Sequence, residues 1–281
     1  MSARVTYARP TDLDDALHII ATTDSLVIAG ATDVYPAMGA GPVPAQFLDI
    51  TQVAGLTGIS VADGRVRIGA ATPWSDVATA DLPPACDALR QAALQVGSVQ
   101  IQNAGTVAGN LCNASPAADG VPPLLVLEAD VELASRERGL RVVPLQDFLT
   151  GVRQTVRAAD ELVTAVRFPV PEPTLGSAFE KLGSRAYLVI SIAMTAAVVG
   201  LDGAGRIAEA RVAVGACSPV AQRLHGLEAQ LVGQDPSRVE VMPEHLAGLS
   251  PISDVRGNAG YRLAAVPEQI ARAVARAAGR E

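Results

Sequence analysis

The spacing of apolar residues divides the chain into three segments with different patterns. Between residues 13 and 21 apolar side chains recur every three or four positions, which predicts a helix with Thr11 as its N-cap. Two short apolar runs, 26–29 and 47–50, have the length of buried strands. Residues 1–53 are therefore predicted to alternate strand and helix in a βαβ-like unit.

Residues 54–172 read mainly as strands joined by tight turns. The runs 59–61 and 65–68 flank Asp63-Gly64, a pair that favours a two-residue hairpin turn. Three prolines between 169 and 173 can continue neither helix nor sheet, so the segment is expected to end there. The other elements expected in this segment are a helix at 83–96 stopped by Gly97, a long polar loop at 98–119, a helix at 122–127, a hairpin of 131–133 with 141–143, and a strand at 162–168.

Residues 173–281 combine long strands with helices. The runs 193–201 and 206–215 are joined by Asp202-Gly-Ala-Gly205, a hairpin signal. Strands followed by helices predict an α+β unit, in which an antiparallel sheet carries helices on one face. The helical stretches expected after the strands are 219–232, 237–247 and 258–278.

Composition narrows the class of protein. The 281 residues carry a net charge of −7 with scattered basic side chains, which argues against nucleic-acid binding. No run of about 18 apolar residues predicts a membrane span, and the first residues lack a secretory pattern, so we expect a cytoplasmic protein. Cys86, Cys112 and Cys217 form no Cys-x-x-Cys pair, so no metal site is expected within this chain.

Two segments rich in glycine, small residues, hydroxyls and amides are the candidates for chemistry. The shorter, 29–33, follows a predicted strand, and the longer covers 100–119 without a lysine or arginine. Glycine lacks the Cβ that would keep backbone N–H groups away from an anion, and a following helix N-terminus adds to the attraction. Two such loops could hold the two ends of one elongated, phosphate-bearing ligand.

The chain resembles the FAD-binding medium subunit of the molybdenum hydroxylases, the group of carbon monoxide and xanthine dehydrogenases. The resemblance implies a fold of the vanillyl-alcohol-oxidase type, with FAD-binding subdomains at 1–53 and 54–172 and a C-terminal α+β domain at 173–281. The motifs that carry it, in order along the chain, are Ala29-Gly-Ala-Thr-Asp33, Gly97-Ser-Val-Gln-Ile-Gln-Asn103, Thr106-Val-Ala-Gly-Asn110 with Ala114-Ser-Pro-Ala-Ala-Asp119, Gly176-Ser-Ala-Phe-Glu-Lys181, and Pro251-Ile-Ser-Asp-Val-Arg-Gly257.

The resemblance also implies a set of FAD contacts and no catalytic residue. Residues 27–34 and the 106–110 turn would hold the diphosphate, Asn113 and Asp119 would reach the adenosine end, and Lys181 would lie near the flavin ring. The implied cofactor-binding residues are Val27, Ile28, Ala29, Gly30, Ala31, Thr32, Asp33, Val34, Val96, Gly97, Thr106, Gly109, Asn110, Cys112, Asn113, Asp119, Val163 and Lys181.

Plainer interpretations stay open for several of these residues. The 29–33 loop alone is also typical of an ordinary glycine turn, Asp119 of a helix cap, and Lys181 of a strand lysine that points to water. The chain departs from the family pattern at Ala108, where glycine is common, at Gln102, where arginine is common, and at 188–190, which often includes an aspartate.

By the same resemblance the chain is an electron-transfer subunit of a heterotrimer. It would bind FAD non-covalently, while a large subunit holds the molybdenum cofactor and a small subunit holds [2Fe–2S] clusters. The assembly would be a dimer of heterotrimers that passes electrons to NAD⁺, dioxygen or a quinone. The alternatives are a stand-alone flavin oxidase or reductase, which needs its own acid–base cluster, and a scaffold that has lost FAD.

Overall fold

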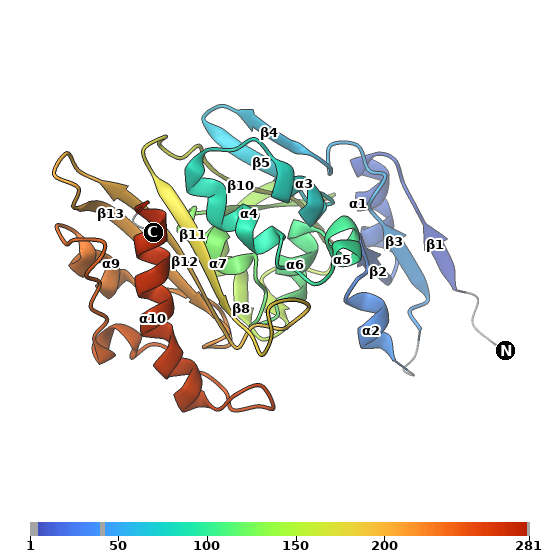
Figure 1. The fold of residues 1–281 in the computed structure, drawn as a ribbon. Helices are drawn as coiled ribbons and strands as arrows, with labels where there is room; N and C mark the ends of the chain where they lie inside the picture. Colours follow the sequence, from blue (N-terminus) through green and yellow to red (C-terminus); the bar gives the residue numbers. More distant parts are fainter. Residues whose placement is uncertain (1–4, 40–42, 280–281) are drawn as a thin grey trace.

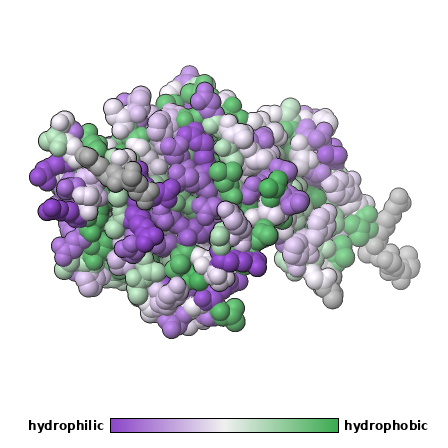
Figure 2. Space-filling model, in the orientation of Figure 1, coloured by the Kyte–Doolittle hydropathy of each residue, from purple (hydrophilic) through white to green (hydrophobic). Residues whose placement is uncertain are grey.

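A computed structural model describes residues 5–39 and 43–279. Three main sheets follow one another along the chain (Figure 1). The N-terminal segment lies at one end of the molecule, the C-terminal segment at the other, and the middle segment between them. Hydrophilic and apolar side chains are interspersed over the face in Figure 2.

The first segment is a small parallel sheet. Its strands β1 (Thr6–Ala8), β2 (Ser25–Ile28) and β3 (Gln46–Asp49) pair in the order β1-β3-β2. Both strands expected here and the helix α1 (Leu13–Thr22) are confirmed, and a short helix α2 (Val34–Met38) follows β2. Strand β1 was not expected, because its three residues are exposed or half-buried and show no apolar pattern.

The N-cap of α1 was predicted one residue too early. The carboxylate of Asp12 accepts a hydrogen bond of 2.9 Å from the backbone N–H of Asp15, as an N-cap does. Both Thr11 and Asp12 suit a cap by residue type, and the position of the first helical turn selects Asp12.

The middle segment is a five-stranded antiparallel sheet. The Asp63-Gly64 turn has φ of 51° and 70° at its two residues, the left-handed conformation that this hairpin turn requires. The predicted hairpins and the predicted long strand are confirmed. In sheet order the strands are β4 (Ile59–Ala62), β5 (Arg65–Gly69), β10 (Glu161–Pro169), β6 (Asp130–Ser135) and β7 (Gly139–Pro144).

Short helices in the middle segment include two in the region predicted as a polar loop. The hydroxyls of Ser98 and Thr106 cap α5 and α6, which lets helices form in a polar stretch with few apolar residues. The helix expected at 83–96 is a 3₁₀ turn followed by a shorter α-helix, and Gly97 beyond it has φ of 55°. The elements are α3 (Trp74–Thr79), η1 (Pro84–Cys86), α4 (Asp87–Ala93), α5 (Val99–Ala104), α6 (Val107–Asn113), α7 (Val121–Val126), α8 (Leu145–Phe148) and the hairpin β8 (Leu149–Gly151) with β9 (Gln154–Thr155).

The last segment is an antiparallel sheet covered on both faces. Helices α9 and α10 pack on one face, as predicted, and α4 and α7 of the middle segment pack on the other. Strand β12 is therefore buried along almost its whole length, and small apolar residues fill it. The elements are β11 (Gly176–Leu182), β12 (Ala193–Leu201), β13 (Ile207–Gly215), β14 (Gln222–Arg223), α9 (His225–Leu231), η2 (Pro243–Leu246) and α10 (Ala259–Ala277).

Two of the three helical stretches predicted in this segment are shorter than expected. The last one, α10, matches its prediction, but 219–232 and 237–247 reduce to α9 and the single 3₁₀ turn η2. Within residues 5–39 and 43–279, no helix has the length and apolar character needed to cross a bilayer.

Replacing the two cap candidates of α1 tests the cap assignment. Asp12→Ala leaves the N–H of Asp15 without its partner, so we expect the free energy of unfolding to fall by about 1 kcal/mol. Thr11→Ala is the matched control and is expected to change it by less than about 0.5 kcal/mol. Chemical denaturation of both variants measures the difference, and equal losses would contradict the assignment.

Candidate functional site

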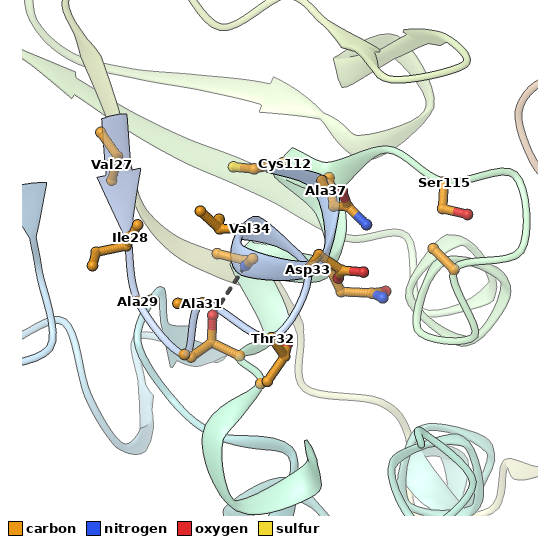
Figure 3. A pocket seen from close by; sticks show the side chains of 18 of the residues that line it. Val27, Ile28, Ala29, Ala31, Thr32, Asp33, Val34, Ala37, Cys112 and Ser115 are labelled. Carbon is orange, nitrogen blue, oxygen red and sulfur yellow. Dashed lines mark hydrogen bonds between the residues drawn. The ribbon is translucent and has the colours of Figure 1, made fainter. Parts of the chain in front are cut away.

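A cavity of about 1260 Å³ lies between the first and middle segments. Its volume exceeds the roughly 300–1,000 Å³ of typical small-molecule sites, so it suits an extended ligand. Residues 188–190 of the last segment complete the wall. Figure 3 shows the side chains of the 27–34 stretch on one side of this space, with Cys112 and Ser115 nearby.

The two glycine-containing turns meet at the cavity. A Cβ placed on Gly30 would overlap the carbonyl oxygen of Ala104, so the first loop touches the second through bare backbone. The second loop also has a glycine at this contact: a Cβ on Gly105 would lie 3.3 Å from the hydroxyl oxygen of Thr32 in the first loop. Ala31 has φ of 54°, so the first loop also includes a left-handed residue. Turns 73 residues apart in sequence therefore form one continuous surface.

Trp74 supports this contact from inside the protein. Its side chain is 1% exposed, and its backbone N–H donates to the carbonyl of Gly105 at 3.0 Å. A Cβ on Gly120 would overlap the indole, so the end of the second loop packs on the same ring. The N–H of Val107 donates to the carbonyl of Thr72 at 3.1 Å, which holds the start of α6 to the same segment.

All but one of the residues implied by the resemblance line this cavity. The exception, Lys181, lies behind the wall. The members on the wall are Val27, Ile28, Ala29, Gly30, Ala31, Thr32, Asp33, Val34, Val96, Gly97, Thr106, Gly109, Asn110, Cys112, Asn113, Asp119 and Val163.

Polar groups of α6 are only partly engaged within the chain. The hydroxyl of Thr106 accepts from the N–H of Gly109 at 3.1 Å, so that N–H is already in use, while the hydroxyl proton has no acceptor within residues 5–39 and 43–279. The amide oxygen of Asn110 is buried and has no hydrogen-bond partner among the described residues. A buried acceptor of this kind is costly unless a ligand or water bonds to it.

Lys181 bonds to Asp119, so it lies neither at the cavity surface nor in water. Its Nζ donates to a carboxylate oxygen of Asp119 at 2.6 Å and to the carbonyl of Gln95 at 3.1 Å. The side chain is 5% exposed, which excludes the solvent-facing interpretation. Burial raises the pKa of Asp119, and the charge of Lys181 and the hydroxyl of Ser191 oppose that rise.

Two arginines on the wall had no signal in the sequence. Arg153, in the β8–β9 turn with φ of 60°, donates to both the backbone and side-chain oxygens of Asn113. Arg157 donates to the carbonyl of Glu161 at 2.7 Å. Both lie in a stretch for which no element was predicted, and only the folded hairpin brings them to the cavity.

Glu161 is a buried carboxylate on the wall with a strong partner. Arg141 forms two hydrogen bonds with it, of 2.6 and 2.8 Å, and the N–H of Ala158 adds another. These contacts, that of Arg141 above all, lower the pKa of Glu161 to about 2. Glu161 is therefore ionised and paired at neutral pH.

Cys112 is an inert part of the wall. Burial raises the pKa of its thiol to about 11, although part of the residue is open to the cavity. The thiol therefore stays protonated and unreactive at neutral pH.

A large cavity between two α/β units, walled by paired glycine turns, defines a protein that binds an extended anionic ligand. Residues 3–171 match the family model described as the FAD binding domain in molybdopterin dehydrogenase. Residues 177–277 match the model of the CO dehydrogenase flavoprotein C-terminal domain. The chain belongs to this family of FAD-binding subunits of molybdenum-containing dehydrogenases, and FAD is its cofactor.

Individual relatives match the sequence of this chain over almost its whole length. The xanthine dehydrogenase FAD-binding subunit of Escherichia coli O157:H7 is 32% identical, with 98% of this chain and 97% of the relative covered. The carbon monoxide dehydrogenase medium chain of Afipia carboxidovorans is 31% identical, with 98% and 96% covered. The structure of reconstituted CO dehydrogenase from Oligotropha carboxidovorans superposes with a TM-score of 0.90 at 28% identity and covers 100% of both chains.

The cavity fits FAD in size and in chemistry. Its volume suits a dinucleotide. The two turns approach each other through glycine backbone, and the buried amide oxygen of Asn110 can accept a hydrogen bond from a ligand. Valine and isoleucine side chains of the wall, such as Val27 and Val163, supply apolar surface for an aromatic ring.

Gly30→Ala tests the contact between the turns. The added methyl collides with the carbonyl of Ala104, so we expect the free energy of unfolding to fall by about 1–3 kcal/mol and the FAD content to drop. Gly203→Ala is the matched control, because a Cβ there meets no atom within 4 Å. Thermal melts and flavin content of both purified variants measure the effect, and equal behaviour would contradict the close approach.

Glu161→Gln tests the paired carboxylate through its pH dependence. The folded pKa of about 2 lies below the ordinary value of 4.5, so the pair stabilises the protein above pH 4.5 and loses that effect as pH falls toward 2. We expect the variant to be about 1.5–3 kcal/mol less stable at neutral pH, with the deficit shrinking toward about pH 3. Urea denaturation at several pH values measures the deficit.

Glu137→Gln, at an exposed turn position, is the control for Glu161→Gln. It is expected to follow the wild-type curve. A deficit for Glu161→Gln that does not change with pH would contradict the role of its charge.

Proposed function

We propose that this chain is the electron-transfer flavoprotein subunit of a heterotrimeric molybdenum hydroxylase. One observation carries the proposal: the two glycine turns meet at the wall of one cavity large enough for an extended dinucleotide. The family to which the chain belongs supports the same role.

The wall residues take different parts in binding. Backbone and hydroxyl groups of 29–33 and 106–110 hold the diphosphate, where Thr32 and Thr106 supply hydroxyl donors. Asn113 faces the adenosine end, and Arg153 orients it by occupying its amide oxygen. Asp119, which the resemblance put at the adenosine end, bonds to Ser191 directly after 188–190, so we assign it to the flavin end instead. Val163 and the 96–97 turn pack against the flavin end, with Leu188, Val189 and Ile190 completing the wall there.

The protein's part in the chemistry is to bind FAD without a covalent link, to orient it and to exclude water. When bound, FAD supplies a redox centre that exchanges electrons singly or in pairs. Asp119 and Glu161 are already held in ion pairs by Lys181 and Arg141, so neither is a free acid or base for a substrate. This arrangement favours an electron-transfer subunit over a stand-alone oxidase or reductase.

Substrate oxidation and electron supply belong to partner subunits. A large subunit holds the molybdenum cofactor, a small subunit holds [2Fe–2S] clusters, and two heterotrimers form the complete assembly. The acceptor is NAD⁺, dioxygen or a quinone. Relatives named as medium chain or FAD-binding subunit of such dehydrogenases support this assignment.

The subdomains divide at residues 53 and 172. Each of the three main sheets lies within one of the segments 1–53, 54–172 and 173–281, and the cavity lies where they meet. Residues 1 and 281, the outer ends of this division, lie outside the described part of the chain.

Co-expression with and without candidate partner subunits tests the function. Expressed alone, the chain is expected to bind FAD and to show no turnover. Expressed with its partners, it is expected to copurify with a molybdenum subunit and an iron–sulfur subunit. Substrate added to the complex should bleach the flavin absorption, and separate additions of NAD⁺, dioxygen or a quinone identify the acceptor by restoring it.

Two outcomes count against the proposal. Turnover of a substrate by the chain alone would favour the stand-alone enzyme. A chain that copurifies with its partners but binds no FAD would favour a scaffold.

A further inference from the structure

The loop between β11 and β12 presents large apolar side chains at the flavin end of the cavity. Leu188 and Ile190 line the cavity wall, and yet they are 54% and 52% exposed. Tyr187 beside them is 80% exposed. Single exposed apolar residues are common, but a group of large ones on one surface marks a binding site.

The turn at 95–98 adds two more exposed apolar residues at this end. Leu94 and Val99, which flank the turn, are 60% and 64% exposed. The buried ion pair behind the wall bonds to the carbonyl of Gln95 on one side and to the hydroxyl of Ser191 on the other, so the turn and the loop lie close together. The apolar rim is defined as Leu94, Val99, Tyr187, Leu188 and Ile190.

The loop holds its part of the rim in a fixed and strained conformation. Leu188 has φ of 53°, a left-handed conformation that is costly for a bulky side chain. The guanidinium of Arg185 donates to the carbonyls of Tyr187 at 3.0 Å and Leu188 at 3.2 Å. Specific contacts therefore maintain a shape that a free loop would relax, which points to a function for the exposed side chains.

The charges at this end distinguish between the three candidate electron acceptors. The wall residues there are uncharged: Val96, Gly97, Val163 and 188–190. Asp119 is held in its ion pair with Lys181, and Arg185 donates to its own loop. NAD⁺ carries a diphosphate, which needs cations or backbone N–H groups to hold it. A quinone is an uncharged ring that gains free energy when it buries apolar surface, and dioxygen needs no built surface.

The shape of the surface favours a small molecule over a partner protein. Leu188 and Ile190 belong to the wall of a cavity. Small-molecule sites are concave and mostly apolar, whereas a stable protein interface covers about 800 Å² of each partner. A small apolar ring can therefore contact these side chains inside the cavity, beside the flavin end.

We propose that the electron acceptor of this subunit is a quinone, which binds against the apolar rim. The inference rests on the proposed function, because that function supplies the flavin end of the cavity. The quinone gains two electrons and two protons and leaves as a hydroquinone, while reduced FAD loses the same two electrons and two protons.

Calorimetric titration with menadione, a small naphthoquinone, tests binding without turnover. The full-length chain is loaded with oxidised FAD, so no electrons are exchanged. Leu188→Asp places a charge on the rim, and aspartate tolerates the left-handed conformation, so the loop keeps its shape. We expect this variant to bind menadione about ten-fold more weakly than the wild type.

Two further variants accompany this titration. Val232→Asp is the matched control, because Val232 is 51% exposed and lies after α9, outside the cavity wall. It is expected to bind menadione as the wild type does. Tyr187→Asp is expected to weaken binding in the same direction as Leu188→Asp, and it replaces that variant if Leu188→Asp does not retain FAD.

Reoxidation of the anaerobically reduced chain identifies the acceptor independently. At equal concentration, menadione is expected to restore the flavin absorption at least about ten-fold faster than NAD⁺. In Leu188→Asp the menadione rate is expected to fall about ten-fold relative to the dioxygen rate of the same variant. Val232→Asp keeps the wild-type ratio.

Each outcome decides for or against the quinone. Faster reoxidation by NAD⁺, or equal menadione binding by Leu188→Asp, Tyr187→Asp and the wild type, overturns the inference and leaves the proposed function intact. Rim variants that bind menadione normally but no longer copurify with the iron–sulfur subunit overturn it too, because the rim would then be a protein interface. Failure of the wild-type chain to bind FAD overturns the proposed function and this inference with it.

Discussion

The cavity depends on the contact between the backbone of Gly30 and the carbonyl of Ala104. No side chain fits between the two turns, so any residue other than glycine would push the walls apart. Trp74 holds the second turn from behind through the carbonyl of Gly105 and through packing against Gly120. Two loops from different sheets thereby act as one rigid surface for a single extended cofactor.

The C-terminal sheet also supports the cavity, because it is buried on both faces. Helix α10 covers one face, and α4 and α7 cover the other, so β11 and β12 belong to the core that also supports the cavity. The polar side chains on those strands must find partners inside the protein, and Lys181 finds Asp119. This ion pair links the C-terminal domain to the wall of the FAD cavity.

Much of the fold was predictable, because local patterns specify it. The Asp63-Gly64 turn, the apolar run of β12 and the amphipathic α10 follow from turn chemistry, continuous apolar sequence and helical periodicity. The errors occurred where patterns are weak. Hydroxyl caps rather than apolar spacing start α5 and α6, and β1 is too short and exposed to carry a pattern.

The sequence by itself determined which residues form the two glycine turns, and that the chain has the motifs of a flavoprotein subunit. Tertiary structure alone decided how those residues are used. Arg153 reaches Asn113 across 40 positions and Lys181 reaches Asp119 across 62, and neither spacing has a local signature. Whether a lysine meets cofactor, water or a buried carboxylate depends on which segments pack together, since burial forces a charge to pair with whatever partner the fold brings near.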